Sequence, residues 1–160
     1  MNGMLSDMKP EYPDADRPTV FDEGVAFQDM VAKIFEQELH IPIDYYETEW
    51  EQKNIGESRQ GIEVKLDTRI LDTKNVSIEV AEKSKGSNPT WIPSGILRKD
   101  NTWLYVQGNP SIILVFGKTI LKRVYDKQYK DRVWTPKPTI KTFLMPLGRA
   151  EQISLKVFRF

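Results

Sequence analysis

Two alternating segments in the middle of the chain carry the side chains best suited to chemistry. Residues 61–71 and 76–83 both alternate apolar with charged or small residues, and the turn-forming residues 72–75 separate them. This pattern predicts two strands joined as a hairpin. Because alternate residues of a strand point to the same face, one face would carry Glu63, Lys65, Asp67, Glu79, Ala81 and Lys83.

Pairing residues 71 and 75 across the turn would place Asp67 opposite Glu79 and Lys65 opposite Ala81. Like charges that face each other destabilise a sheet, so a cation is expected between the two carboxylates. Mg²⁺ takes oxygen ligands and needs only one or two protein carboxylates beside water and substrate phosphate. The sequence therefore predicts Mg²⁺, with Mn²⁺ as a substitute, held by Glu63, Glu79 and Asp67.

The lysines on this face have a complementary role. Lys65 or Lys83 would position or activate an attacking water and stabilise negative charge on a phosphate. Glu57, in the segment before the first strand, either completes the metal site or lies on the plain surface. The pattern equally fits an ordinary half-exposed hairpin whose alternating charges form cross-strand ion pairs.

Several segments together resemble the PD-(D/E)XK nuclease superfamily, phage-type members included. They are 56–63 (GESRQGIE), 77–83 (SIEVAEK), 93–96 (PSGI) and 100–106 (DNTWLYV). The resemblance covers residues 22–120 and implies that Glu63 is the first acid of the motif and Glu79 the second. Ala81 stands where the motif has lysine, so the resemblance implies a displaced lysine, at Lys83 or Lys65.

The resemblance implies an α/β fold: a restriction-endonuclease-like central mixed sheet of about five strands flanked by helices. It implies Mg²⁺-dependent hydrolysis of DNA phosphodiester bonds and, since many similar nucleases are dimers, a homodimer. An alternative is a catalytically inactive nuclease fold that binds nucleic acid or protein, which Ala81 and the net charge of zero favour. A further alternative is an interaction protein with a salt-bridged surface.

Charge is distributed unevenly along the chain. Residues 1–60 carry 14 acidic and 5 basic side chains, whereas residues 118–160 carry 3 acidic and 11 basic ones. The basic end predicts a surface for the DNA backbone, with solvated surface as the alternative reading. Its expected contacts are Lys118, Lys122, Arg123, Lys127, Arg132 and Trp134.

The remaining patterns predict the organisation of the chain. Residues 1–20 are expected to form a flexible arm and residues 21–160 a single domain. Helices are expected over 22–39 and 117–132, a loop over 48–60, and strands over 41–47, 102–106, 112–116 and 153–160.

Composition narrows the chemistry and the location. The chain has no cysteine and one histidine, His40, which excludes disulfides, thiolate metal sites and multi-histidine metal sites. No run of 18 apolar residues predicts a membrane span. The first residues lack the basic start and apolar core of a signal peptide, so a cytoplasmic location is expected.

Overall fold

A computed structural model of the chain describes residues 20–160, in which two four-stranded sheets combine with helices. The first sheet has the order β1-β4-β5-β8, and its strands are β1 (Ile62–Leu66), β4 (Leu104–Asn109), β5 (Ile112–Gly117) and β8 (Lys156–Arg159). The second has the order β3-β2-β7-β6, with β3 (Ile92–Pro93), β2 (Asn75–Glu82), β7 (Ile140–Pro146) and β6 (Trp134–Lys137). The helical segments are α1 (Val20–Ile34), η1 (Phe35–Leu39), α2 (Glu49–Asn54), α3 (Ile70–Thr73), η2 (Gly95–Leu97), α4 (Lys118–Val124), η3 (Tyr125–Tyr129) and α5 (Leu147–Ile153).

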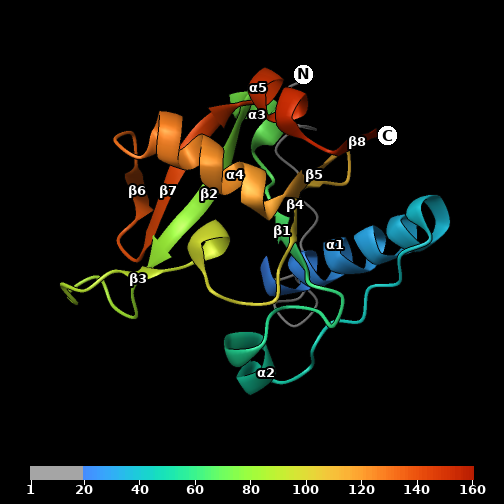
Figure 1. Cartoon of the computed structure of the whole chain (residues 1–160), viewed down its shortest axis with the longest axis horizontal. Helices are drawn as coiled ribbons and strands as arrows, with labels where there is room; N and C mark the ends of the chain where they lie inside the picture. The colour runs from blue at the N-terminus through green and yellow to red at the C-terminus, as the bar shows by residue number, and fades with distance from the viewer. Residues whose placement is uncertain (1–19) are drawn as a thin grey trace, which may run out of the picture.

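The predicted helix over residues 22–39 is confirmed. Phe27, Val31 and Phe35 recur every four residues, so they form one buried stripe that packs with Ile62 and its neighbours in the first sheet. Helix α1 continues into the π-helical turn η1 and ends at His40, whose φ of 54° is left-handed. The stripe explains why α1 covers one face of the first sheet (Figure 1).

The second sheet covers part of the opposite face of the first (Figure 1). Along β4, Leu104 and Val106 belong to the core beneath α1, whereas Tyr105 belongs to the core shared with β2 and β7. On the second sheet, Ile78 and Phe143 are fully buried in that shared core. Because side chains alternate along a strand, the polar residues of β1 face the side on which the second sheet lies.

The predicted hairpin is wrong, since its two strands belong to different sheets. Strand β1 pairs in parallel with β4, and β2 pairs with β3 and β7. After Leu66 the chain leaves the first sheet and enters the short helix α3; in the turn before this helix the Asp67 carboxylate accepts a hydrogen bond from the Arg69 N–H. Lys74, with a φ of 57°, then turns the chain into β2.

The expected α/β class is confirmed, with two sheets in place of one central sheet. The helix over 117–132 is confirmed as α4 and η3, and β4, β5 and β8 lie within or beside the expected strands. The expected loop over 48–60 contains α2, which Thr48 caps by accepting a hydrogen bond from the Glu51 N–H. The expected strand over 41–47 is reduced to one bridge between Tyr45 and Ser58.

Two expectations concern the ends of the chain and membranes. The arm expected over residues 1–20 lies, up to residue 19, outside the described residues, and Val20 begins α1. Across residues 20–160, none of the helices has the length and apolar character that a membrane span requires.

Candidate active site

Glu63 is the most deeply buried acidic residue of the predicted cluster. It lies on the edge strand β1, on the face turned toward the second sheet, and its side chain is 1% exposed. Its Oε1 lies 3.4 Å from the Lys65 Nζ, two residues further along the same face. Its Oε2 is buried and accepts no hydrogen bond from any group among residues 20–160.

Burial raises the pKa of the Glu63 carboxyl to about 7. The positive charges of Lys65 and Lys118 oppose this shift, whereas the negative charges of Glu57 and Asp100 add to it. The carboxyl is therefore divided between its neutral and charged forms near neutral pH. A divalent cation beside it would favour the charged form.

Lys65 remains an ammonium at this site. Burial lowers the pKa of the Lys65 amine, but the charges of Glu63, Glu79 and Glu57 outweigh burial and hold that pKa above its usual value. Lys65 therefore acts as a fixed positive charge and hydrogen-bond donor.

Glu79 reaches the same place from the second sheet. Strand β2 is irregular between Glu79 and Ala81, and the Ser94 N–H bonds to the Val80 carbonyl oxygen beside this irregularity. Gly95, with a φ of 54°, lies so close that an added Cβ would be 2.1 Å from the Glu79 carbonyl oxygen. Only glycine fits there, and its presence keeps η2 packed against β2.

A pocket of about 320 Å³ joins these groups. Its wall includes Glu57, Glu63, Lys65, Glu79, Ser94 and Arg98. The Ser94 hydroxyl is buried without a hydrogen-bond partner, like Glu63 Oε2. Two residues that each have a buried polar atom without a hydrogen bond among residues 20–160 therefore line one pocket, and such atoms call for a partner such as water, an ion or a ligand.

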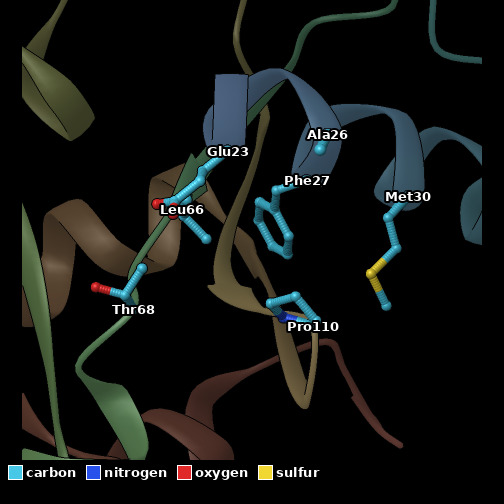
Figure 2. A pocket seen from close by; sticks show the side chains of 7 residues that line it. All are labelled: Glu23, Ala26, Phe27, Met30, Leu66, Thr68 and Pro110. Carbon is cyan, nitrogen blue, oxygen red and sulfur yellow. The ribbon is translucent and has the colours of Figure 1, made fainter. Parts of the chain in front are cut away.

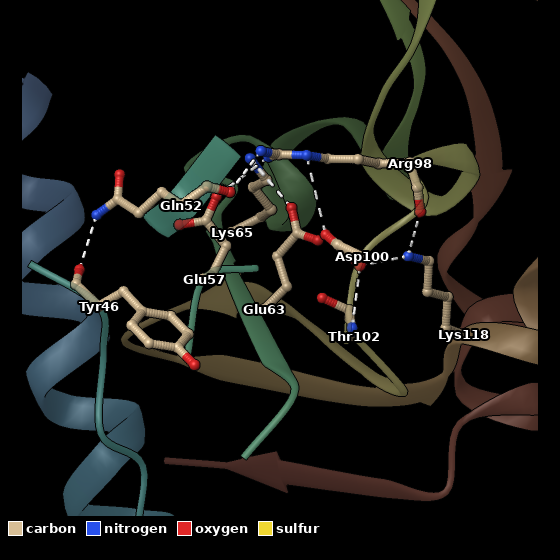
Figure 3. Close-up of polar contacts among 9 residues, drawn as sticks. All are labelled: Tyr46, Gln52, Glu57, Glu63, Lys65, Arg98, Asp100, Thr102 and Lys118. Carbon is tan, nitrogen blue, oxygen red and sulfur yellow. Dashed lines mark hydrogen bonds and ion pairs between the residues drawn. The ribbon is translucent and has the colours of Figure 1, made fainter. Parts of the chain in front are cut away.

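An ionic network supports the pocket from behind (Figure 3). Arg98 lies 3.7 Å from a Glu57 oxygen and 3.9 Å from Asp100 Oδ2, and it donates a hydrogen bond to the Gln52 carbonyl oxygen. Lys118 Nζ donates to Asp100 Oδ1 at 2.8 Å and to the Arg98 carbonyl oxygen at 2.6 Å. The network ties α2, the η2 segment and α4 together around Glu63.

Sequence reasoning placed Glu63, Lys65 and Glu79 together, and the structure does bring them to one pocket. Glu57 belongs to that pocket too. Asp67 does not line it, and both its carboxylate oxygens already accept hydrogen bonds, from Arg69, Ser77 and Gln107. Asp67 therefore has a structural role at the start of α3.

Of the two candidate lysines, Lys65 and Lys83, the structure places Lys65 in the wall of the pocket. Lys83 Nζ lies 4.4 Å from the centre of the Trp91 ring, and Lys141 lies 4.5 Å from the same centre. Lys83 is absent from the pocket wall, whereas Lys65 lies within it. The same-face argument fails for Lys83 because the irregularity after Glu79 breaks the strict alternation.

The basic surface also needs one correction. Lys118 is buried and bound to Asp100, so it cannot meet the backbone of DNA. The other expected contacts are exposed: Lys122, Arg123, Lys127, Arg132 and Trp134. The sequence patterns did not single out Arg98 and Asp100 as site residues, because both lie between η2 and β4, where no periodicity marks them.

The pocket offers carboxylates from two strands to a cation. Within residues 20–160 there is no preformed group of three or more histidine, cysteine, aspartate or glutamate side chains for a metal. Glu63 and Glu79 could supply the one or two carboxylates that Mg²⁺ requires when substrate and water complete its shell. The donor set therefore fits Mg²⁺ better than a metal that needs an all-protein cage.

A separate pocket of about 370 Å³ lies beside α1 (Figure 2). Its walls are mostly apolar, with Phe27, Met30, Leu66 and Pro110, and among the described residues that line it Glu23 alone is ionisable. Figure 2 shows Phe27 and Met30 extending from α1 on the side where Leu66 and Pro110 lie. It lacks the charged donors that chemistry on a phosphate requires.

Comparison with known proteins adds no relative. No protein-family model matches the chain, and neither a curated protein nor a solved structure matches it significantly.

Proposed function

We propose that the protein is a Mg²⁺-dependent nuclease of the restriction-endonuclease-like type that hydrolyses DNA phosphodiester bonds. One observation carries this proposal: strands of two different sheets bring Glu63, Lys65 and Glu79 to one pocket. The unpartnered Glu63 Oε2 supports it, because a buried carboxylate oxygen without a donor suits a bound cation.

Each of the three side chains has a distinct role in the proposed reaction. Glu63 and Glu79 would hold Mg²⁺, which supplies Lewis-acid stabilisation of the charge that develops on the phosphate. Lys65, kept protonated by the surrounding acids, would donate hydrogen bonds to a phosphate oxygen or to the attacking water. Arg98 would hold Glu57 and the η2 segment in place behind them.

A second function, a nuclease fold that binds DNA without cleaving it, is favoured by Ala81. This residue stands in the motif's lysine position, and its neighbours across the sheet are Pro93 and Lys141. If Lys65 does not replace the missing lysine, binding would persist and hydrolysis would not. Cleavage, rather than DNA binding, therefore separates the two functions.

The Glu79→Gln variant tests the proposed function. Mg²⁺-dependent cleavage of single-stranded, duplex and branched DNA is measured for the wild type and the variant, and circular dichroism checks the fold. We expect cleavage to fall by at least about a hundredfold, because even changes to groups behind a metal ligand reach that size. Glu38→Gln, on the exposed end of the first helix, is the matched control and keeps full activity. Full activity of Glu79→Gln would refute the site.

A further inference from the structure

The pocket that holds Glu63 continues into a groove. A second hollow of about 420 Å³ shares Lys65 and Glu79 with it. A third hollow, of about 300 Å³, shares Asp67, Arg69, Ser77 and Pro136 with the second. The three hollows therefore adjoin in series along the polar face of the second sheet, and the third is lined by Trp134.

Strand register fixes the direction of this groove. Glu79 pairs with Thr142 on β7, and Thr142 pairs in turn with Trp134 on β6. Residues directly opposite each other on antiparallel strands point to the same face, so Trp134 shares the face of Glu79. Two strand spacings separate them, which places their backbones about 10 Å apart.

The middle hollow contains polar atoms that the protein leaves unpaired. Thr142 Oγ1 and Gln107 Oε1 are both buried, and the part of the chain that the structure describes offers neither of them a hydrogen-bond partner. The Gln107 amide group donates to Asp67 Oδ2 at 2.8 Å and to the Ser77 carbonyl oxygen at 2.7 Å, so its oxygen is held in a fixed position. Both residues line the hollow, where a polar ligand could meet them.

The groove also carries positive charge and an aromatic ring. Arg69 and Lys137 are exposed on its walls, and within residues 20–160 neither forms a side-chain ion pair. The Trp134 side chain, on the edge strand β6, is 48% exposed. Cationic side chains that follow a backbone, together with an aromatic ring for stacking, are the two elements of single-strand binding.

We propose that this groove binds single-stranded DNA. Arg69 and Lys137 contact its phosphates, and an unpaired base stacks on Trp134 close to the phosphate at Glu79. A base within a duplex is already stacked on its neighbours, so Trp134 selects an unpaired strand. The inference rests on the proposed function only for the placement of a phosphate at Glu79, since the binding itself needs no hydrolysis.

The test is the affinity for a labelled oligothymidylate, measured by fluorescence anisotropy with EDTA present so that cleavage cannot occur. We expect Trp134→Ala to weaken binding at least about fivefold and Trp134→Phe to retain most of it, because stacking needs an aromatic ring. Trp50→Ala is the matched control: Trp50 is 67% exposed and lies outside the groove. A double variant, Arg69→Gln with Lys137→Gln, should lower the salt dependence of the logarithm of the affinity by about 0.7 for each phosphate that the protein no longer neutralises.

The outcomes separate this inference from the proposed function. Binding that depends on Trp134 in a protein without Mg²⁺-dependent cleavage supports the groove and refutes the nuclease. Cleavage with unchanged single-strand affinity in Trp134→Ala supports the nuclease and refutes the groove. An equal loss of affinity for a blunt duplex in Trp134→Ala would overturn the selection of an unpaired strand.

Discussion

Two buried carboxylates, Asp100 and Glu63, each lie beside a lysine but differ in how closely that lysine is bound. The Asp100 side chain is fully buried, and its Oδ1 accepts hydrogen bonds from Lys118 Nζ at 2.8 Å and from the Thr102 N–H at 3.0 Å. Glu63 is 1% exposed, but its lysine lies 3.4 Å away and one of its oxygens has no partner. We call Asp100–Lys118 the closed pair, because a direct hydrogen bond of 2.8 Å joins it, and Glu63–Lys65 the open pair, because its charged atoms lie 3.4 Å apart beside the pocket that Glu79 also lines. Among residues 20–160, Asp100 Oδ2 is also buried without a hydrogen bond, but it lies 3.9 Å from Arg98 Nε.

The two pairs therefore differ in their expected roles: the closed pair stabilises the fold, and the open pair can bind a ligand. A buried ion pair is tolerated when hydrogen bonds satisfy its charges, as they do for Lys118. In the pair Glu63–Lys65, Glu63 Oε2 has no hydrogen-bond partner among residues 20–160. Burial raises the pKa of the Glu63 carboxyl to about 7. A bound cation would compensate the charge of the Glu63 carboxylate, and a bound phosphate would accept hydrogen bonds from Lys65.

The largest effect is expected where the closed pair is broken. Lys118→Met leaves Asp100 as a buried charge without its main partner, so the free energy of unfolding should fall by about 3–5 kcal/mol. Urea denaturation measures it. Lys122→Met, on the same helix and exposed, should change that free energy by less than about 0.5 kcal/mol. Equal losses in the two variants would remove the distinction between the closed pair and the surface.

Replacing the lysine of the open pair, Lys65, should lower the rate of DNA cleavage. Lys65→Met removes the ammonium beside Glu63 and Glu79, so the turnover number for DNA cleavage should fall about a hundredfold or more. Lys83→Met leaves the pocket wall unchanged and should cleave like the wild type. Single-turnover kinetics at saturating DNA measure both rates. If the cleavage rate fell more in Lys83→Met than in Lys65→Met, Lys83 rather than Lys65 would have the role of the motif lysine.

The smallest expected effect is the pH dependence of stability. The folded-state pKa of Glu63, about 7, lies above the ordinary value of 4.5, so the folded protein retains a proton that the unfolded chain has lost. Wild-type stability should therefore fall as the pH rises from 4.5 to about 7. Glu63→Gln lacks this titration and should be more stable than the wild type by about 1–3 kcal/mol at pH 8. Denaturation across this pH range, without metal, measures the difference, and parallel curves would contradict it.

The sequence predicted the convergence of Glu63, Lys65 and Glu79, although by an incorrect pairing. The alternation of apolar and polar residues predicts which side chains share a face of a strand, but it does not predict which strands are neighbours. Helix α3 leads the chain from β1 into β2, which belongs to the other sheet. Even so, Glu63, Lys65 and Glu79 line one pocket. The apolar residues of the two strands lie in different cores, Ile62 and Val64 of β1 beneath α1 and Val76, Ile78 and Val80 of β2 between the sheets, which leaves the polar side chains of both strands to line one pocket.

Sequence reasoning could not find what depends on loops and on irregular strands. Arg98 and Asp100 follow η2 in a segment without periodicity, so no pattern places them behind Glu63. The departure of Lys83 from the pocket follows from the irregularity at Glu79, which is set by contact with Gly95. Burial of Lys118 reflects its pairing with Asp100, a contact between residues far apart in the chain.

The most direct test of the open pocket is calorimetric titration of Mn²⁺ into the wild type and Glu79→Gln, each with a short 5′-phosphorylated oligonucleotide present. Mn²⁺ accepts the same oxygen ligands as Mg²⁺, and the oligonucleotide supplies the phosphate that completes its shell. We predict a binding isotherm for the wild type that exceeds the oligonucleotide background and that Glu79→Gln abolishes. Identical isotherms for the two proteins would contradict a metal site shared by Glu63 and Glu79.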